Sequence, residues 1–532
     1  MKDRLHWIVI LLVGAIISIG ITEGELFFFG DETRHAMTGV FFRDLIVDHP
    51  WHNPTQYAYE YYAKYPSLGL VYWPPLFHMV EGVFFLIFGI SVITSRLTIL
   101  LYALAGVYFW YRIAEREGPR YRALLSALMF PLLPWMLLYE RVVMLEIPKV
   151  AMCLAAIYFW QSFVREERSR DLWWFAFFLV VTFLTSQKAV FLAFFVCLHF
   201  LVERRWKLLK RWDVWVAAFL SVAVVAPWYE FMLRKLSLSY ERVAGQGFQH
   251  ATALNHLTYY PHFVLLQTGI LVGVLGMAGF VWAGLRARKE HRFFLIWIVA
   301  CYLCYTLVQE KSIRHTMIWI PVLVYFTLVV VETLIPRRRW LIAALCVLSI
   351  YSVWKAVFRT FTPKMSGVEP IAQYVLAQPE SDVLYYQGSL NGDFIFLVRK
   401  HDPQKRRFIA REKQIVATKI NAGYGTRRIL TTPEEVVQMF QTMGIRYAAV
   451  ENREFIGGLG PVHVALLSDQ FEPVRIFDIH SNVAEFKNRR VTLYRFKGDL
   501  QSPAGTVTLP MMTLREDITV DFHRLAGRPW PN

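Results

Sequence analysis

Asp31 and Glu32 are adjacent carboxylates that directly follow an apolar segment, in the stretch FFFGDETRHA. A carboxylate held at a membrane surface can deprotonate an acceptor hydroxyl, and a positioned base typically gives about 10²–10⁴-fold in rate. The competing interpretation is structural, because acidic residues are favoured in the first turn of a helix. Asp31 and Glu32 are therefore candidate catalytic residues, and the residues alone leave both interpretations open.

Several cationic residues adjoin apolar segments and suit a phosphate ligand. Lys188 lies in FLTSQKAVF between two apolar runs, and Arg96 begins another run. Arg314 and His315 occur together in QEKSIRHTMIWIP. A cation at membrane depth costs roughly 2.5–3.5 kcal/mol, so it is a functional candidate by default; the alternative for Lys188 is a side chain that extends to the interface. Cations from separate helices fit a phosphate, for which Arg offers a planar pair of donors.

Further polar and aromatic residues stand in turns between apolar segments. Glu146 in YERVVMLEIPK is an additional acid, whereas Glu140 and Arg141 of that stretch could form a local ion pair. Trp228 and Tyr229 in VAPWYEF belong either to an interfacial aromatic belt or to a platform for a sugar ring. The sequence contains no GxxxxGK[ST], HExxH or GxSxG motif, which excludes the corresponding classes of soluble enzyme.

Long apolar segments must position these residues. The chain has 532 residues and a mean hydropathy of +0.35. Up to about residue 360 the apolar residues form blocks of roughly 16 to 22, near the ~20 residues that a helix needs to cross a membrane. We predict spans near residues 6–22, 96–111, 123–139, 147–164, 171–185, 189–202, 214–229, 262–284, 293–309, 316–335 and 340–358.

The fold class follows from this pattern. Residues 1–362 are predicted to form a polytopic α-helical membrane domain with about eleven transmembrane helices plus juxtamembrane helices. Residues 363–532 have short apolar clusters and are predicted to form a soluble α/β domain. Its expected strands are SDVLYYQG, DFIFLV, IRYAAVE and VTLYRF, and its expected helices are EPIAQYVLAQ and TPEEVVQMFQTMG. The domain shows no catalytic constellation, so we expect it to dock an acceptor or to cover the site.

The charge pattern predicts the topology. Much of the net charge of +16 lies in short loops between apolar blocks, near residues 112–122, 165–170, 203–211, 286–292 and 337–339. This positive-inside pattern argues against a nucleic-acid partner and places these loops in the cytoplasm. If residues 72–93 crossed the membrane, every later loop would change sides and the basic loops would lie outside. We therefore expect these residues to lie along the outer surface. The N-terminus is then cytoplasmic and the C-terminal domain extracytoplasmic, in the inner (plasma) membrane.

All five cysteines lie in the apolar blocks, so the soluble domain needs no disulfide framework. Cys301 and Cys304 have CxxC spacing, but they lie in an apolar segment without His or further Cys partners. A metal site is therefore not predicted.

Five motifs occur in a fixed order between residue 1 and about residue 330: GDETRHA, YWPPLFH, FGISVITSRLT, TSQKAVF with APWY, and SIRHTMIWIP. In this order they resemble the GT-C superfamily of glycosyltransferases, in the branch of the protein O-mannosyltransferases (the dolichyl-phosphate-mannose-protein mannosyltransferase family) and the lipid A aminoarabinose transferase. The resemblance implies a GT-C fold and an inverting transfer from a polyprenyl-phosphate monosaccharide to a hydroxyl acceptor. It also implies a site open to membrane lipid, with no metal or other cofactor required.

The resemblance also implies roles for residues. Asp31 matches the position of the family's proposed base, with Glu32 as its companion. Donor phosphate contacts are implied for Arg96, Lys188, Arg314 and His315, and substrate contacts for Lys64, Tyr72, Glu146, Trp228 and Tyr229. Related transferases often have a lysine just before the PPL motif; here Trp73 and Pro74 stand there, and Lys64 is the candidate substitute. Glu146 stands where many relatives have Asp.

Two other functions fit the same residues. A transporter would also place charges within a membrane, but it predicts internal repeats, and the two halves of the apolar region show none. A non-catalytic protein that binds a polyprenyl lipid is the second alternative.

Overall fold

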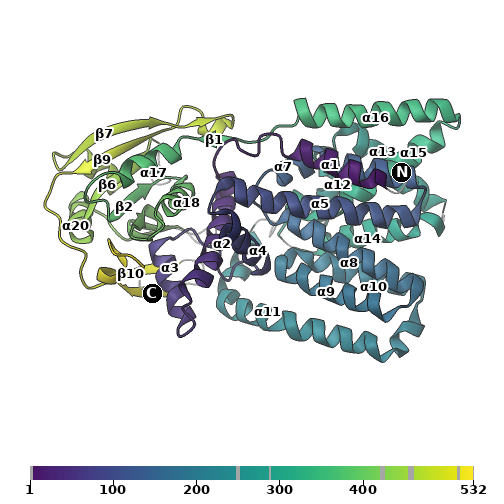
Figure 1. Cartoon of the computed structure of the whole chain (residues 1–532), viewed down its shortest axis with the longest axis horizontal. Helices are drawn as coiled ribbons and strands as arrows, with labels where there is room; N and C mark the ends of the chain where they lie inside the picture. Colours follow the sequence, from purple (N-terminus) through teal and green to yellow (C-terminus); the bar gives the residue numbers. More distant parts are fainter. Residues whose placement is uncertain are drawn as a thin grey trace.

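The computed structural model describes the chain except for residues 1–3, 247–251, 287–288, 309, 420–425, 453–459, 512–515 and 531–532. Figure 1 shows a bundle of roughly parallel and antiparallel helices with a sheet-containing domain at one end. Helices α2, α3 and α4 lie between the two parts, and the N-terminus lies at the far end of the bundle. The predicted fold class, a helical membrane protein with a C-terminal α/β domain, is confirmed.

In the part of the chain that the structure describes, the bundle and the layer beside it contain sixteen α-helices. They are α1 (Leu5–Ile17), α2 (Asp31–Asp48), α3 (Pro54–Lys64), α4 (Leu76–Phe88), α5 (Val92–Glu117), α6 (Arg120–Met129), α7 (Pro134–Glu140), α8 (Glu146–Glu166), α9 (Ser169–Thr185), α10 (Phe191–Glu203), α11 (Trp212–Gln246), α12 (Ala253–Thr268), α13 (Ile270–Leu285), α14 (Arg292–Leu307), α15 (Ile320–Leu334) and α16 (Arg338–Phe358).

Within the described residues, six helices are long and apolar enough to cross a membrane, and one bent pair would make seven. They are α5, α8, α16, residues 212–235 of α11, α14 with its preceding turn, and α15 with its preceding turn. Helices α1 and α13 are apolar but shorter. Helical segments occupy every predicted span, and the number of about eleven crossings stays a prediction.

Two predicted spans are broken, which corrects the expectation of continuous helices. Residues 123–139 divide into α6, a short 3-10 turn and α7, with a bend of 67°. Pro131 and Pro134 account for this bend because proline lacks the amide hydrogen that an α-helix needs. Residues 262–284 divide into α12 and α13 at Gly269, whose φ of 78° suits glycine.

Helices α2 and α4 pack closely at two glycines. A Cβ atom added to Gly82 would lie 3.0 Å from the carbonyl oxygen of Gly39 and 3.0 Å from the amide nitrogen of Arg43. Larger residues at Gly82 would therefore push the two backbones apart. This contact holds α4, from the segment predicted to lie along the outer surface, against α2.

The C-terminal domain is built on a five-stranded mixed sheet with the order β3-β2-β6-β9-β7. Strand β2 is parallel to β3 and β6, whereas β9 is antiparallel to β6 and β7. The strands are β1 (Met365–Ser366), β2 (Val383–Gln387), β3 (Phe408–Arg411), β4 (Ala417–Lys419), β5 (Thr426–Arg428), β6 (Ile445–Glu451), β7 (Phe471–Asp478), β8 (His480–Ser481), β9 (Arg490–Phe496), β10 (Thr506–Met511) and β11 (Glu516–Asp521).

The helices of this domain are α17 (Val368–Leu376), α18 (Asn391–His401), α19 (Glu412–Ile415), α20 (Pro433–Met443), α21 (Pro461–Leu466) and α22 (Phe522–Leu525). Helix α20 starts with the expected capping box of Thr432 and Glu435. The predicted strand DFIFLV is wrong, because these residues lie in α18. Almost all of α18 is buried, and a short apolar run that is buried all round does not distinguish a helix from a strand.

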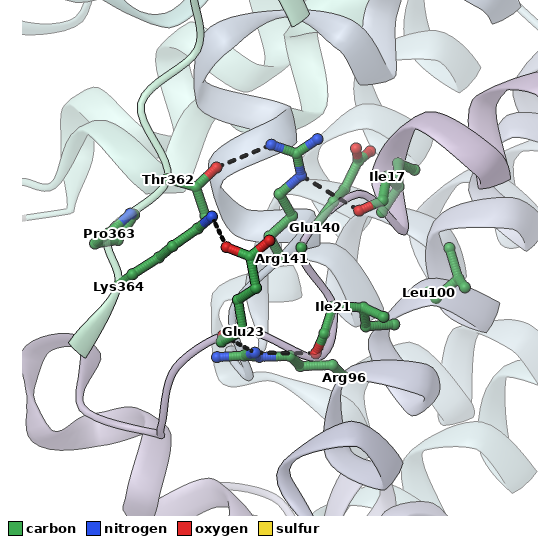
Figure 2. Close-up of a pocket in the computed structure, with 11 residues that line it drawn as sticks. Ile17, Ile21, Glu23, Arg96, Leu100, Glu140, Arg141, Thr362, Pro363 and Lys364 are labelled. Atoms are coloured by element: carbon green, nitrogen blue, oxygen red, sulfur yellow. Dashed lines mark hydrogen bonds and ion pairs between the residues drawn. The ribbon is translucent and has the colours of Figure 1, made fainter. Parts of the chain in front are cut away.

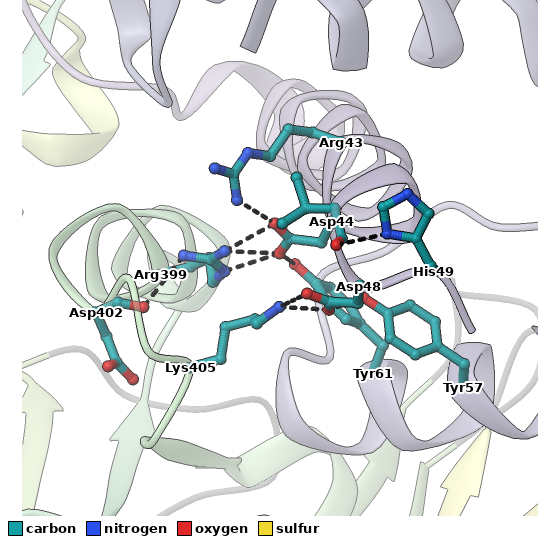
Figure 3. A network of polar contacts seen from close by, with 10 residues as sticks. Arg43, Asp44, Asp48, His49, Tyr57, Tyr61, Arg399, Asp402 and Lys405 are labelled. Atoms are coloured by element: carbon teal, nitrogen blue, oxygen red, sulfur yellow. Dashed lines mark hydrogen bonds and ion pairs between the residues drawn. The ribbon is translucent and has the colours of Figure 1, made fainter. Parts of the chain in front are cut away.

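A buried ion pair joins the domain to α2. The Arg399 guanidinium on α18 donates to both Asp44 oxygens, with Nη2–O distances of 2.7 and 2.8 Å and an Nε–Oδ2 distance of 3.0 Å. The Tyr61 hydroxyl donates to the same carboxylate at 2.7 Å, and Lys405 pairs with Asp48 one turn further along α2 (Figure 3). The C-terminal end of α2 is therefore fixed to the soluble domain.

Candidate active site

Helix α2 begins where the chain leaves a 3-10 turn, Phe28–Gly30, and Glu32 anchors this start. Its Oε2 accepts the amide hydrogens of Phe27 and Phe28 at 3.0 Å each. Its Oε1 accepts the amide hydrogen of Val143, between α7 and α8, at 2.9 Å. Glu32 is buried with both oxygens engaged by backbone amides. This geometry orients α2 and distinguishes Glu32 from its neighbour Asp31.

Asp31 is the more accessible acid of the pair. Its side chain is 24% exposed, and Oδ1 lies 3.6 Å from Nη1 of Arg34. Burial raises the pKa of Asp31 above its usual value; the charges of Arg34 and Arg314 oppose this rise, and Glu146 and Glu310 add to it. Charges from α8 and from the segment after α14 therefore act on Asp31, although they are distant in sequence.

Arg314 faces Glu146 across the site. Arg314 lies in the 3-10 helix Ile313–Trp319, and its Nε is 3.3 Å from Oε1 of Glu146, the first residue of α8. The buried Lys149, one turn along α8, lies 3.5 Å from the backbone oxygens of Arg314 and His315. The His315 ring is buried, stacks on Tyr305 and lies 3.5 Å from the Tyr260 hydroxyl. The backbone that carries Arg314 is therefore well packed.

Lys188 forms the next part of the site. It lies in the 3-10 turn Gln187–Val190 between α9 and α10, and its ammonium pairs with Glu310. The Tyr305 hydroxyl fixes this turn by donating to the Lys188 carbonyl oxygen at 2.7 Å. Lys188 borders a cavity of about 220 Å³ whose other lining residues are Gln187, Val190, Tyr229, Met232, Leu233 and Val308. The lining is mostly apolar, with Lys188 as its charged member.

Tyr72, Trp228 and Tyr229 lie around the same turn. The Gln187 side chain donates to the Tyr72 carbonyl oxygen at 3.4 Å, and the Tyr229 hydroxyl donates to the Phe183 carbonyl oxygen at 2.9 Å. Trp228 is half-buried beside Tyr229 on α11. The structure therefore brings Tyr72 and Tyr229, which are far apart in the sequence, to the Lys188 turn.

Arg96 lies in a different place. Its guanidinium donates to the backbone oxygens of Ile21 at 3.0 Å, Glu23 at 2.6 Å and Glu25 at 3.4 Å. Figure 2 shows it below Glu23, whose carboxylate pairs with Lys364. These contacts hold the connection between α1 and α2. The described contacts of Arg96 do not include Arg314 or Lys188, so its predicted phosphate contact stays a prediction.

Lys64 also lies away from Asp31. It is buried under the C-terminal segment, where its Nζ donates to the Leu525 carbonyl oxygen at 2.6 Å and lies 5.4 Å from the centre of the Trp530 ring. Burial lowers the pKa of Lys64 to about 7. Its described contacts belong to the interface between α3 and the soluble domain, and its suggested role in place of the missing lysine stays a prediction.

Comparisons with known proteins agree with this architecture. The family model for dolichyl-phosphate-mannose-protein mannosyltransferase matches residues 73–231. ArnT from Cupriavidus metallidurans, solved bound to undecaprenyl phosphate, is 14% identical, with 91% of this chain and 97% of that chain covered and a TM-score of 0.59. Its apo state gives 13% identity, the same coverage and a TM-score of 0.57. The Archaeoglobus fulgidus oligosaccharyltransferase, solved with Zn and sulfate, gives 11% identity, coverage of 83% and 68%, and a TM-score of 0.53. No curated protein matches the sequence.

This chain has the GT-C fold. The resemblance inferred from its motifs is confirmed, and the family-model match relates the chain to glycosyltransferases. Its described residues include six helices that are long and apolar enough to cross a membrane, as in a multi-pass membrane protein. Within its described residues, no group of three or more His, Cys, Asp or Glu side chains is arranged to hold a metal ion.

Two residues of this site were not singled out from the sequence. In the sequence, Glu310 is one of several polar residues in the stretch QEKSIRHTMIWIP. Its pairing with Lys188 is a contact between segments that are far apart in the chain. His35 lies one turn after Asp31, and its Nδ1 is 3.0 Å from Nε2 of His78 on α4. Burial holds the pKa of His35 well below its usual value, helped by the charges of His78, Arg314 and Arg34. The i, i+4 spacing from Asp31 was the available signal for His35.

Proposed function

We propose that this protein is an inverting glycosyltransferase that moves a monosaccharide from a polyprenyl-phosphate donor to a hydroxyl acceptor at the outer face of the membrane. The observation that carries the proposal is the convergence at α2 of an accessible acid, Asp31, with the Arg314–Glu146 and Lys188–Glu310 pairs. One group can take a proton, and two cations can hold a phosphate.

Each group has a task in such a transfer. The acceptor oxygen attacks the anomeric carbon while its proton moves to the Asp31 carboxylate. The bond between that carbon and the phosphate oxygen breaks, and the phosphate leaves with the electron pair. A raised pKa makes Asp31 a stronger base than an ordinary aspartate. Arg314 and Lys188 stabilise the charge that develops on the leaving phosphate, and no metal or other cofactor is needed for these steps.

The cavity beside Lys188 suits a lipid-linked donor. Its wall includes Tyr229, Met232 and Leu233 from α11, a helix whose membrane-crossing window is only 17% buried. An apolar wall on a lipid-exposed helix allows a polyprenyl chain to approach from the bilayer while its phosphate reaches Lys188. Tyr229 and Trp228 could then pack against the sugar ring, with Tyr72 and Glu146 as further substrate contacts. The ArnT structure bound to undecaprenyl phosphate supports a donor of this class.

We place the protein in the inner (plasma) membrane, with its N-terminus in the cytoplasm and with the site and the C-terminal domain on the extracytoplasmic side. The positive-inside distribution of the basic loops supports this orientation. This orientation requires the N-terminus and the soluble domain to lie on opposite sides of the membrane. The two lie at opposite ends of the bundle (Figure 1). Cysteines introduced at positions 31 and 188 should both react with a membrane-impermeant reagent applied from outside. Labelling of only one position would contradict the orientation and the site together.

An activity assay separates the proposal from its two rivals. Purified protein is given a polyprenyl-phosphate sugar and an acceptor extract, and free polyprenyl phosphate is measured. We expect release that disappears in Asp31→Asn and persists in Asp478→Asn, which changes a 65% exposed carboxylate in the soluble domain. Undiminished release in Asp31→Asn would exclude Asp31 as the base. Lipid binding without any release would favour a non-catalytic binding protein, and sugar movement across vesicles would favour a transporter.

A further inference from the structure

The pairing of Lys188 with Glu310 raises the question of what the carboxylate does in a phosphate site. The Lys188 side chain is 21% exposed and the Glu310 side chain 39%, so both remain open to exchange. Lys188 is the charged member of the cavity lining, and the adjacent Gln187 amide already donates to the Tyr72 carbonyl oxygen. An anion that enters this cavity must therefore meet the ammonium group that Glu310 holds.

The segment that carries Glu310 is fixed at its next residue. The Lys311 ammonium donates to the carbonyl oxygens of Tyr305 at 2.9 Å, Thr306 at 2.6 Å and Val308 at 2.5 Å, at the C-terminal end of α14. It also lies 5.7 Å from the centre of the Tyr260 ring. The hydrogen bonds of Lys311 therefore fix the backbone of this segment, and the fixed backbone holds Glu310 near Lys188.

We propose that Glu310 occupies the place of the donor phosphate on Lys188 in the free protein, and that its carboxylate favours departure of the product over departure of the donor. This inference rests on the proposed function. A polyprenyl-phosphate sugar is a phosphodiester with one negative charge, whereas free polyprenyl phosphate is a monoester with about −1.5 to −2 at pH 7. Glu310 repels the second species more strongly. Transfer of the sugar therefore converts the singly charged donor, which the Glu310 carboxylate repels weakly, into free polyprenyl phosphate, which the carboxylate displaces from Lys188.

The expected effects follow from the exposure of the pair. Two charges with this exposure interact by at most about 1 kcal/mol, which is about fivefold in a binding constant; this sets the repulsion between Glu310 and a doubly charged phosphate, and a singly charged phosphate feels about half of it. Glu310→Gln should therefore tighten binding of a polyprenyl monoester by about fivefold. It should tighten binding of a singly charged diester by about twofold. The ratio of the monoester affinity to the diester affinity, rather than either affinity alone, shows whether Glu310 discriminates between the two lipids.

The experiment measures binding of two lipids to the detergent-solubilised full chain. The probes are undecaprenyl phosphate and its methyl ester, which is a phosphodiester with one charge. The proteins are wild type, Glu310→Gln, Lys188→Gln, the double variant, and Glu230→Gln as a matched control. Glu230 is an exposed glutamate on α11 that pairs with Arg234, so its replacement removes one charge outside the cavity.

We expect Glu310→Gln to shift the affinity ratio toward the monoester, Glu230→Gln to leave it unchanged, and the Glu310→Gln effect to disappear in the Lys188→Gln background. An unchanged affinity ratio in Glu310→Gln overturns the inference. The inference is also overturned if Glu310→Gln shifts the ratio equally in the wild-type and Lys188→Gln backgrounds. In both cases wild-type binding leaves the proposed function intact. If wild type binds neither lipid, the proposed function itself falls, so the two failures are distinguishable.

Discussion

Removal of the Arg399 guanidinium would test how firmly the soluble domain holds α2. Arg399→Met keeps the length and apolar volume of the side chain but leaves the Asp44 carboxylate buried without its main partner. Arg399 is 1% exposed and Asp44 0% exposed. Burial would raise the pKa of Asp44, but Arg399 and Lys405 more than offset this and hold it below its usual value.

The size of the effect follows from this burial. Breaking a buried ion pair by removing one partner typically costs about 3–5 kcal/mol. Two contacts remain for Asp44: Nη1 of the 28% exposed Arg43 at 2.6 Å and the Tyr61 hydroxyl at 2.7 Å. We therefore expect about 3 kcal/mol, the low end of that range, which is roughly a hundredfold increase in molecules with the interface open.

Hydrogen exchange of the α2 and α18 amides measures this opening. Arg495→Met is the matched control, because Arg495 is 50% exposed and lies 3.5 Å from a 45% exposed Glu472. That control should change exchange by less than about fivefold. Asp44→Asn combined with Arg399→Met should recover much of the protection, since the buried side chain at position 44 that lost its main partner is then uncharged. If Arg399→Met exchanged as slowly as Arg495→Met, the interface would not depend on this ion pair and the reasoning would be refuted.

Three further predictions concern titratable groups outside the spans. Because the pKa of Asp31 is raised, kcat/KM should rise with pH through a value above the usual aspartate range, and a rise only below that range would contradict its role as base. Burial and the nearby Glu25 raise the pKa of Asp393 well above its usual value, so stability should fall as pH rises from about 4 through that pKa. Asp393→Asn should flatten this fall in thermal unfolding. The pKa of Lys64 is lowered to about 7, so the unfolded chain binds more protons and stability should rise between pH 7 and about 10. Lys64→Met should remove that rise, and an unchanged slope would show that Lys64 is not buried as described.

Much of the fold could be predicted because membrane spans and strands leave periodic patterns. The block lengths located helical segments at every span, and the capping box at Thr432 located the start of α20. The breaks at Pro134 and Gly269 and the helical state of residues 393–398 were missed. Pro131 and Pro134 are visible break signals, but they do not give the size of the bend, and local composition does not show that a short apolar run is buried on all sides.

The site could be predicted only in part, because its residues meet through distant contacts. Asp31, Arg314 and Lys188 stood out as charges beside apolar segments, which is unusual enough to mark function. Arg96 stood out for the same reason and Lys64 through the family resemblance, yet the described hydrogen bonds of both are with backbone carbonyl oxygens. Sequence identifies a costly buried charge, but only the packed structure shows whether its partner is protein backbone or an open cavity.

A structure of the protein with undecaprenyl phosphate bound tests the central claim most directly. The account predicts a phosphate in contact with Lys188 and Arg314, a polyprenyl chain along α11 beside Tyr229, and the Asp31 carboxylate facing the space next to the phosphate. A phosphate bound beside Arg96, or anywhere that leaves Asp31 on the far side of α2 from it, would contradict the account.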